Sequence, residues 1–203
     1  MPAPIPGSGP HPGPGRFLER LAAVPVLAIL RAADAGRFLE VGRVLYEAGV
    51  RAIEMTLTSR GALEAFGRLR GELAGDAVLG VGTVRSARDA ELAVEAGATY
   101  LVAPDFRPDV VAWAAGATAV KVFPVSVVGG PAYLKAVRAP LPEVPLVPTG
   151  GVGIGDIGAY LAAGALAVGI GSPLLGDAGD PGGDLDGLAE RARLAVAAAR
   201  VGR

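Results

Sequence analysis

The chain contains no cysteine and only one histidine among its 203 residues. The absence of cysteine excludes a disulfide framework, thiol catalysis and zinc–thiolate sites, although it does not fix the redox compartment. The histidine, His11, lies in a tail rich in glycine and proline. A histidine-based catalytic triad or a multi-histidine metal site is therefore excluded.

Charge of one sign and long apolar runs are also scarce. The net charge is -1 with the signs interspersed, so we expect neither a nucleic-acid partner nor a polybasic membrane anchor. The longest uncharged stretch, residues 157–176, contains five glycines and a proline, which favours a buried helix and strand over a membrane span.

The first 15 residues, MPAPIPGSGPHPGPG, include ten glycines or prolines and lack the basic start and apolar core of a signal peptide. We predict a disordered extension over residues 1–15. Residues 16–203 then form a single domain, because half of the chain is apolar and suffices for one sizeable core.

From residue 24 onward, short runs of β-branched residues alternate with helix-length, alanine-rich segments. This pattern predicts an α/β fold with a parallel sheet. The expected strands are VPVLAIL, RAIEMTLT, AVLGVGTV, TYLVAPD, AVKVFP, PLVPTG and AVGIGS.

An Ala-Gly pair precedes four of these strands, and glycine there suits a left-handed helix cap. The glycines are at positions 49, 97, 116 and 164, separated by 48, 19 and 48 residues. If the repeat marks every second helix of a TIM-type (βα)8 barrel, one βα unit is missing between residues 105 and 117. A real deletion, an unwritten segment and a rearranged or strand-borrowing barrel would all explain the spacing.

Function in parallel βα proteins is expected at the carboxyl ends of the strands, where several polar residues converge. Lys121 is one of only two lysines in the chain, and it alternates with Val120 and Val122, so it should point into the barrel. A desolvated lysine supplies the neutral amine that attacks a ketone, which a guanidinium cannot do. The alternative is a structural lysine paired with a carboxylate.

Glu54 also interrupts an apolar strand, where an unpaired carboxylate would be costly. Facing an imine-forming lysine, it could move protons through a water molecule. The alternative is a buried ion pair with Lys121 or Arg31.

The segments PTGGVGIGD and GIGSPL close the last two strands, and their glycines would let backbone N–H groups approach a phosphate. Glycine serving only as a turn residue is the alternative. GIGDIG within this region also matches the dinucleotide fingerprint, but the chain leaves no room for a full nucleotide-binding half.

Four motifs, AIEMTL, VGTVRSARDAELAVEAGATYLVAP, AVKVFP and PTGGV, occur in this order along the chain. Together they resemble the 2-keto-3-deoxy-6-phosphogluconate (KDPG) aldolase family, which includes phosphogalactonate and 4-hydroxy-2-oxoglutarate aldolases. The resemblance extends over roughly residues 17 to 200. It implies a class I aldolase without metal or cofactor, homotrimeric and cytoplasmic, in carbohydrate metabolism of the Entner–Doudoroff type.

The resemblance also assigns roles. Lys121 would be the Schiff-base lysine and Glu54 the general acid/base. The remaining positions would bind a phosphorylated keto acid: Thr83 its carboxylate, Pro104 and Phe123 the pocket wall, Thr149 the substrate chain, and Gly150, Gly151, Gly171 and Ser172 the phosphate.

Two departures from the family stand out. Thr58 replaces an arginine found four residues after the glutamate in many members, and Arg31 would substitute for that cation. The second departure is the missing unit, which removes a wall beside Lys121. We therefore expect cleavage of KDPG or a close analogue to pyruvate and glyceraldehyde 3-phosphate, with a phosphosugar isomerase or synthase, or an inactive phosphate-binding variant, as alternatives.

Overall fold

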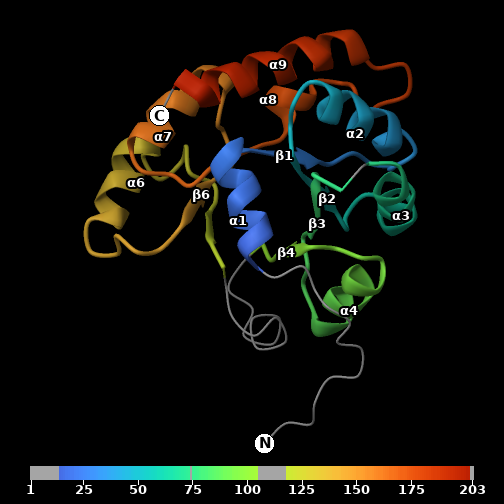
Figure 1. Cartoon of the computed structure of the whole chain (residues 1–203), viewed down its shortest axis with the longest axis horizontal. Coiled ribbons are helices and arrows are strands. Elements are labelled where there is room, and N and C mark those ends of the chain that lie inside the picture. Colours follow the sequence, from blue (N-terminus) through green and yellow to red (C-terminus); the bar gives the residue numbers. More distant parts are fainter. Residues whose placement is uncertain (1–13, 74, 105–117, 202–203) are drawn as a thin grey trace, which may run out of the picture.

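The computed structural model describes residues 14–73, 75–104 and 118–201 (Figure 1). Each of the seven expected strands is present at its predicted place. The bounds are β1 Val26–Leu30, β2 Ala52–Thr56, β3 Val78–Gly82, β4 Tyr100–Val102, β5 Val120–Val122, β6 Leu146–Pro148 and β7 Val168–Ile170. All the paired strands are parallel, which confirms the predicted α/β class.

The strands follow the order of an incomplete barrel. Five of them form a sheet in the order β4-β3-β2-β1-β7, and the other two pair as β5-β6. A bridge between Thr149 and Gly169 joins the end of β6 to β7. The strands described thus run in one arc, as in a TIM-type barrel, with β4 and β5 at its two ends.

The missing unit was predicted for the position between these two end strands. Residues 105–117, to which the sequence assigns it, lie outside the described residues. Within the described part of the chain, β5 pairs only with β6, and Val120 is 45% exposed. Val122, on the same face of β5 as Val120, packs against the larger apolar core.

Helices surround the strands. Their bounds are α1 Pro14–Ala23, α2 Phe38–Glu47, α3 Ala62–Glu72, α4 Ala87–Glu95, α6 Gly130–Arg138, α7 Ile157–Ala162, α8 Ser172–Leu175 and α9 Leu185–Val201, with a 3-10 turn, η1, at Ile154–Asp156. The long α9 lies along one edge of the molecule against α2, α7 and α8 (Figure 1).

The Ala-Gly repeat has the mechanical cause that the sequence predicted. Gly49, Gly97 and Gly164 follow α2, α4 and α7 with φ angles of 100°, 93° and 91°. Backbone there is left-handed, which L side chains disfavour, so each helix ends at a glycine. Gly116 lies outside the described residues.

Alternation along the strands separates two apolar cores. Val26, Ile53 and Val81 belong to the larger core between strands and outer helices. Leu27 and Ala52 belong to a smaller core inside the barrel, where Phe17 and Leu21 of α1 pack against them. Because these inner residues begin their strands, α1 closes the amino-terminal end of the barrel and leaves the carboxyl-terminal rim for chemistry.

The first helix begins inside the segment that the sequence assigned to the tail. The helix α1 begins at Pro14, so Pro14 and Gly15 belong to the helix and the predicted tail boundary is wrong by two residues. Proline is well suited to a first helical turn.

The uncharged stretch of residues 157–176 contains a helix and a strand, as predicted: it holds α7, β7 and also the short α8. Among the described residues, no helix combines the length and apolarity that crossing a membrane requires.

Candidate active site

A lysine and a glutamate meet inside the barrel. Glu54 lies on β2 and Lys121 on β5, and the distance from Lys121 Nζ to Glu54 Oε1 is 3.6 Å. The glutamate side chain is fully buried, whereas 21% of the lysine side chain is exposed. The structure therefore brings together the two residues that interrupt apolar strands, in an arrangement that serves either an ion pair or amine chemistry.

The neighbouring strand makes room for the carboxylate. A Cβ atom on Gly82 of β3 would lie 2.5 Å from Glu54 Cδ and 2.8 Å from its Cγ, which is too close for any side chain. Neither carboxylate oxygen has a hydrogen-bond partner within the described residues. The Glu54 carboxylate thus lies directly over the backbone of β3.

Burial raises the pKa of the Glu54 carboxyl above its ordinary value. The Lys121 ammonium opposes this effect, and the Arg31 guanidinium does so more weakly. A carboxyl group that takes up and releases a proton more readily near neutral pH is suited to general acid/base work.

Arg31 and Thr83 meet at the carboxyl-terminal rim. The Arg31 guanidinium donates a hydrogen bond of 3.3 Å to Thr83 Oγ1. Thr83 has a φ of 61°, the left-handed region that β-branched residues avoid. Such strain persists only where the surroundings impose it and is concentrated at functional sites.

Thr58, which stands where the resemblance leads us to expect an arginine, takes part in a local hydrogen-bond network. Thr58 donates to Thr56 Oγ1 at 3.2 Å, and Thr56 donates to the Leu30 carbonyl at 3.2 Å. Ser59 accepts a hydrogen bond from the Ala32 N–H. These bonds tie the segment after β2 to the end of β1 and the loop that follows it. Besides Lys121, Arg31 is a cation whose charge lowers the pKa of Glu54.

Thr149, Gly150 and Gly151 follow β6 beside the lysine strand. Thr149 is buried, and its hydroxyl donates to the Val147 carbonyl at 3.3 Å. Gly150 and Gly151 have φ angles of 86° and 73°. Side chains at these glycines would collide with Phe123 and Ser126, respectively, so chain geometry alone already requires glycine at both positions.

The other predicted rim residues lie at strand ends as expected. Gly171 and Ser172 follow β7, the neighbour of β6, where Ser172 begins α8. Phe123 is 60% exposed, and its ring lies 5.9 Å from Lys121 Nζ. Pro104 is exposed after β4, and Asp105 lies outside the described residues.

Sequence reasoning missed Tyr100 of β4. Its ring lies against Phe17 with 4.3 Å between centroids, and its buried hydroxyl has no hydrogen-bond partner in the described residues. The period-2 alternation that placed Lys121 inside the barrel can also be applied to β4, where it would place Tyr100 inside, so the signal was present. Tyrosine is common in apolar strands, so its presence there did not mark Tyr100 as a candidate site residue.

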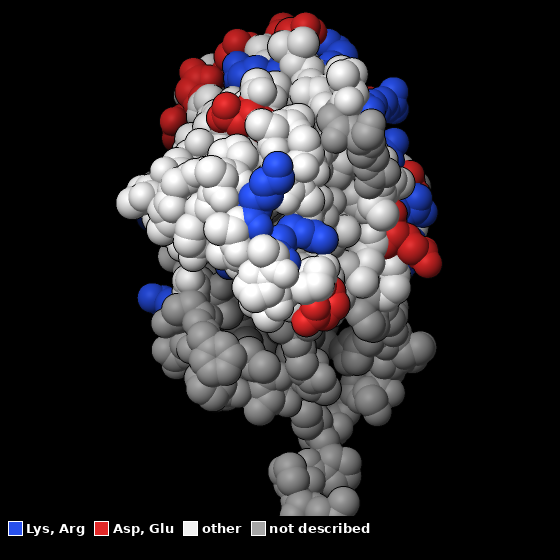
Figure 2. Space-filling view, turned by 90° about the vertical axis from the view of Figure 1, so that its left-hand side faces the viewer, with Lys and Arg blue, Asp and Glu red and all other residues white. Residues whose placement is uncertain are grey.

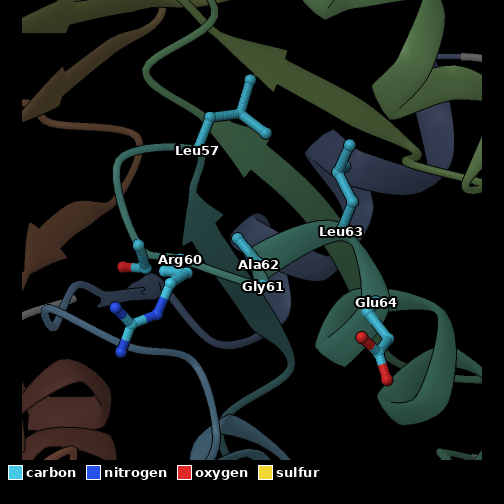
Figure 3. Close-up of a pocket in the computed structure, with 7 residues that line it drawn as sticks. Leu57, Arg60, Gly61, Ala62, Leu63 and Glu64 are labelled. Atoms are coloured by element: carbon cyan, nitrogen blue, oxygen red, sulfur yellow. The ribbon is translucent and has the colours of Figure 1, made fainter.

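Other places in the described structure lack these features. A surface hollow near the rim is lined by residues 57 and 59–64, with Arg60 and Glu64 pointing to opposite sides (Figure 3), but neither Glu54 nor Lys121 reaches it. The GIGDIG segment forms the turn into η1, where the Gly153 N–H donates to Asp156. No group of three histidine, cysteine or acidic residues comes together within the described ranges.

The fold and site together define a TIM-type barrel enzyme with a lysine–carboxylate pair inside it. The profile of the family described as KDPG and KHG aldolase matches residues 17–115 and 110–186. The chain belongs to the KDPG and KHG aldolase family. The prediction of a carbon–carbon lyase of the class I aldolase type is thereby confirmed at the level of the family.

Individual relatives agree with this assignment. A 2-dehydro-3-deoxy-phosphogluconate aldolase of Treponema pallidum is 34% identical over 167 residues, which is 71% of this chain and 78% of that protein. The crystal structure of a 4-hydroxy-2-oxoglutarate/2-dehydro-3-deoxyphosphogluconate aldolase from TTHB1 is 35% identical, with a TM-score of 0.77 over 90% of this chain and 98% of that one. A KDPG aldolase from Zymomonas mobilis is 27% identical, with a TM-score of 0.77 over 88% and 95%. The two family-profile segments meet at residues 110–115, inside the range assigned to the missing unit.

Proposed function

We propose that this protein cleaves 2-keto-3-deoxy-6-phosphogluconate, or a close analogue, through a Schiff base on Lys121. The observation that carries the proposal is the 3.6 Å approach of Lys121 Nζ to the fully buried Glu54 carboxylate inside the barrel. The partial exposure of Lys121 gives a substrate ketone access to the amine. The names of the relatives supply the substrate class.

Cleavage would proceed through an imine and an enamine on Lys121. The neutral Lys121 Nζ attacks the C2 carbonyl, and Glu54 in its protonated form gives a proton to the carbinolamine hydroxyl, which leaves as water; a protonated imine and an ionised Glu54 result. The C3–C4 bond then breaks as its electrons flow to the imine nitrogen, while the C4 hydroxyl gives its proton to Glu54 directly or through water. The aldehyde leaves, Glu54 returns the proton to C3 of the enamine, and water releases pyruvate from Lys121.

Positions at the rim would hold the two ends of the substrate. Arg31 and Thr83 present a cation and a hydroxyl on the side of Glu54, which suits the carboxylate. Gly150, Gly151, Gly171 and Ser172 follow two adjacent strands, and exposed backbone at such loops suits the phosphate. Thr149, Phe123 and Pro104 would line the space between the two ends.

Pyruvate release from KDPG, from its galactonate epimer and from the unphosphorylated acid tests the proposal. Lys121→Arg should abolish turnover, whereas Lys135→Arg provides a matched control, since Lys135 is the only other lysine and lies on α6. Turnover that survives Lys121→Arg would refute the imine mechanism. Isomerisation of a phosphosugar without pyruvate release would favour the isomerase alternative.

We also propose a homotrimer in the cytoplasm. Val127 and Val128, in the segment that joins β5 to α6, are exposed by 79% and 45%, and Tyr133 of α6 is exposed by 39%. Exposed apolar side chains close together in the chain support a subunit contact. The face in Figure 2 is mostly uncharged, with some basic side chains near its centre and other charges toward its edges. Light scattering after size exclusion should give three chains, and Val127→Asp should lower that number; a monomeric wild type would contradict the trimer.

A further inference from the structure

Three buried polar atoms inside the barrel lack a hydrogen-bond partner within the described residues. They are the two carboxylate oxygens of Glu54 and the hydroxyl oxygen of Tyr100. A buried polar group without a partner costs stability, so such groups are rare and call for an explanation. The proposed chemistry explains why the Glu54 carboxylate is buried without a partner, but it does not explain the Tyr100 hydroxyl.

The two side chains converge over the same strand. Glu54 of β2 is opposite Gly80 of β3, which is in turn opposite Tyr100 of β4. A Cβ on Gly80 would overlap Cζ and Cε2 of the Tyr100 ring, and a Cβ on Gly82 would overlap the Glu54 carboxylate. These glycines are successive positions on one face of β3, so the Tyr100 ring and the Glu54 carboxylate lie over adjacent positions of that face.

The two groups are chemically complementary. An ionised carboxylate only accepts hydrogen bonds, and a phenol can donate one. Burial raises the pKa of Tyr100 well above its ordinary value, and the Glu54 charge raises it further, so the phenol keeps its proton over the working range of an enzyme. Phe17 fixes the ring from the closed end of the barrel, at 4.3 Å between centroids.

We propose that Tyr100 is a positioning residue for Glu54, and that its hydroxyl donates a hydrogen bond to the Glu54 carboxylate, directly or through one water, during the reaction. This inference rests on the proposed role of Glu54 as general acid/base. The other charged groups that act on Glu54 are Lys121 from β5 and Arg31 from the end of β1, while β3 contributes only glycines at this level. Tyr100 of β4 therefore supplies a neutral donor in addition to these cations.

The test is the exchange of pyruvate methyl protons for deuterium, followed by NMR as a function of pH. Exchange needs the imine at Lys121 and a base, and it falls at acid pH as Glu54 is protonated. Donation to the carboxylate favours its ionised form, so Tyr100→Phe should move the acid limb upward by about one pH unit and slow exchange about tenfold on that limb. The alkaline plateau should stay unchanged, because Glu54 is ionised there in both proteins.

Tyr100→Phe keeps the ring between Phe17 and Gly80, so it isolates the hydroxyl. Tyr160→Phe is the matched control, because it removes the hydroxyl of another buried tyrosine, on α7 and outside the barrel, and should leave the profile unchanged. Coincident acid limbs for wild type and Tyr100→Phe would overturn the inference even if exchange is fast. Failure of the proposed function looks different: the wild type itself would neither exchange protons nor form a borohydride-reducible adduct with pyruvate, and the inference would fall with it.

Discussion

A methyl group added at Gly82 should disable the enzyme although no polar residue is replaced. Gly82 is the last residue of β3, and its backbone does not have a left-handed φ, so alanine fits the local conformation. The new Cβ would lie 2.5 Å from Glu54 Cδ, whereas an ordinary contact between carbons is about 3.5 Å. The carboxylate must therefore move by about 1 Å, away from β3.

A misplacement of about 1 Å in a reacting group can cost about 100-fold in rate. We expect kcat for aldol cleavage to fall by roughly this factor in Gly82→Ala. Crowding of the buried barrel should also cost about 1–3 kcal/mol of stability. Lys121 is not displaced directly, so pyruvate should still form an imine that borohydride can trap.

The assay follows pyruvate release with saturating substrate, alongside urea unfolding of each variant. Gly67→Ala is the matched control: it lies in α3, and its Cβ would meet nothing within 4 Å. The control should keep full activity and gain up to about 1 kcal/mol from the better helix propensity of alanine. A folded Gly82→Ala enzyme with kcat within twofold of wild type would refute the placement of Glu54 as the acid/base.

Two further predictions concern stability. The folded-state pKa of Glu54 is raised, so ionising this carboxyl costs stability as the pH rises past its ordinary pKa of 4.5. The unfolding free energy of Glu54→Gln should therefore equal that of the wild type near pH 4 and exceed it by about 1–3 kcal/mol at pH 8, while the variant loses activity. Urea unfolding at both pH values measures this difference, and a difference that does not grow with pH would contradict the prediction. Thr83 has a φ of 61°, and asparagine tolerates this left-handed backbone better than threonine. Thr83→Asn should therefore raise the unfolding free energy by about 1 kcal/mol. A lower urea midpoint for the variant than for the wild type would argue against strain at this residue.

The strands and the central pair could be predicted because their signals are local. Each strand is a β-branched run next to a helix-length segment, and Glu54 and Lys121 are isolated charges in such runs. Alternation then places both side chains on the inner face. The left-handed caps at Gly49, Gly97 and Gly164 follow from the same local logic.

The features that escaped prediction depend on neighbouring strands. Gly80 and Gly82 look like weak points of a strand, and only the register shows that Tyr100 and Glu54 occupy the space above them. The positive φ of Thr83 contradicts its side-chain type, so no propensity could indicate it.

The central claim is that Lys121 forms an imine inside this barrel, and reductive trapping tests it most directly. The protein is incubated with pyruvate and sodium borohydride, and the added mass is located by peptide mapping in wild type, Lys121→Arg and Lys135→Arg. The account predicts one reduced pyruvate adduct, on Lys121, that is lost in Lys121→Arg and retained in Lys135→Arg. The absence of an adduct on Lys121 would contradict it and leave Lys121 and Glu54 as a buried ion pair.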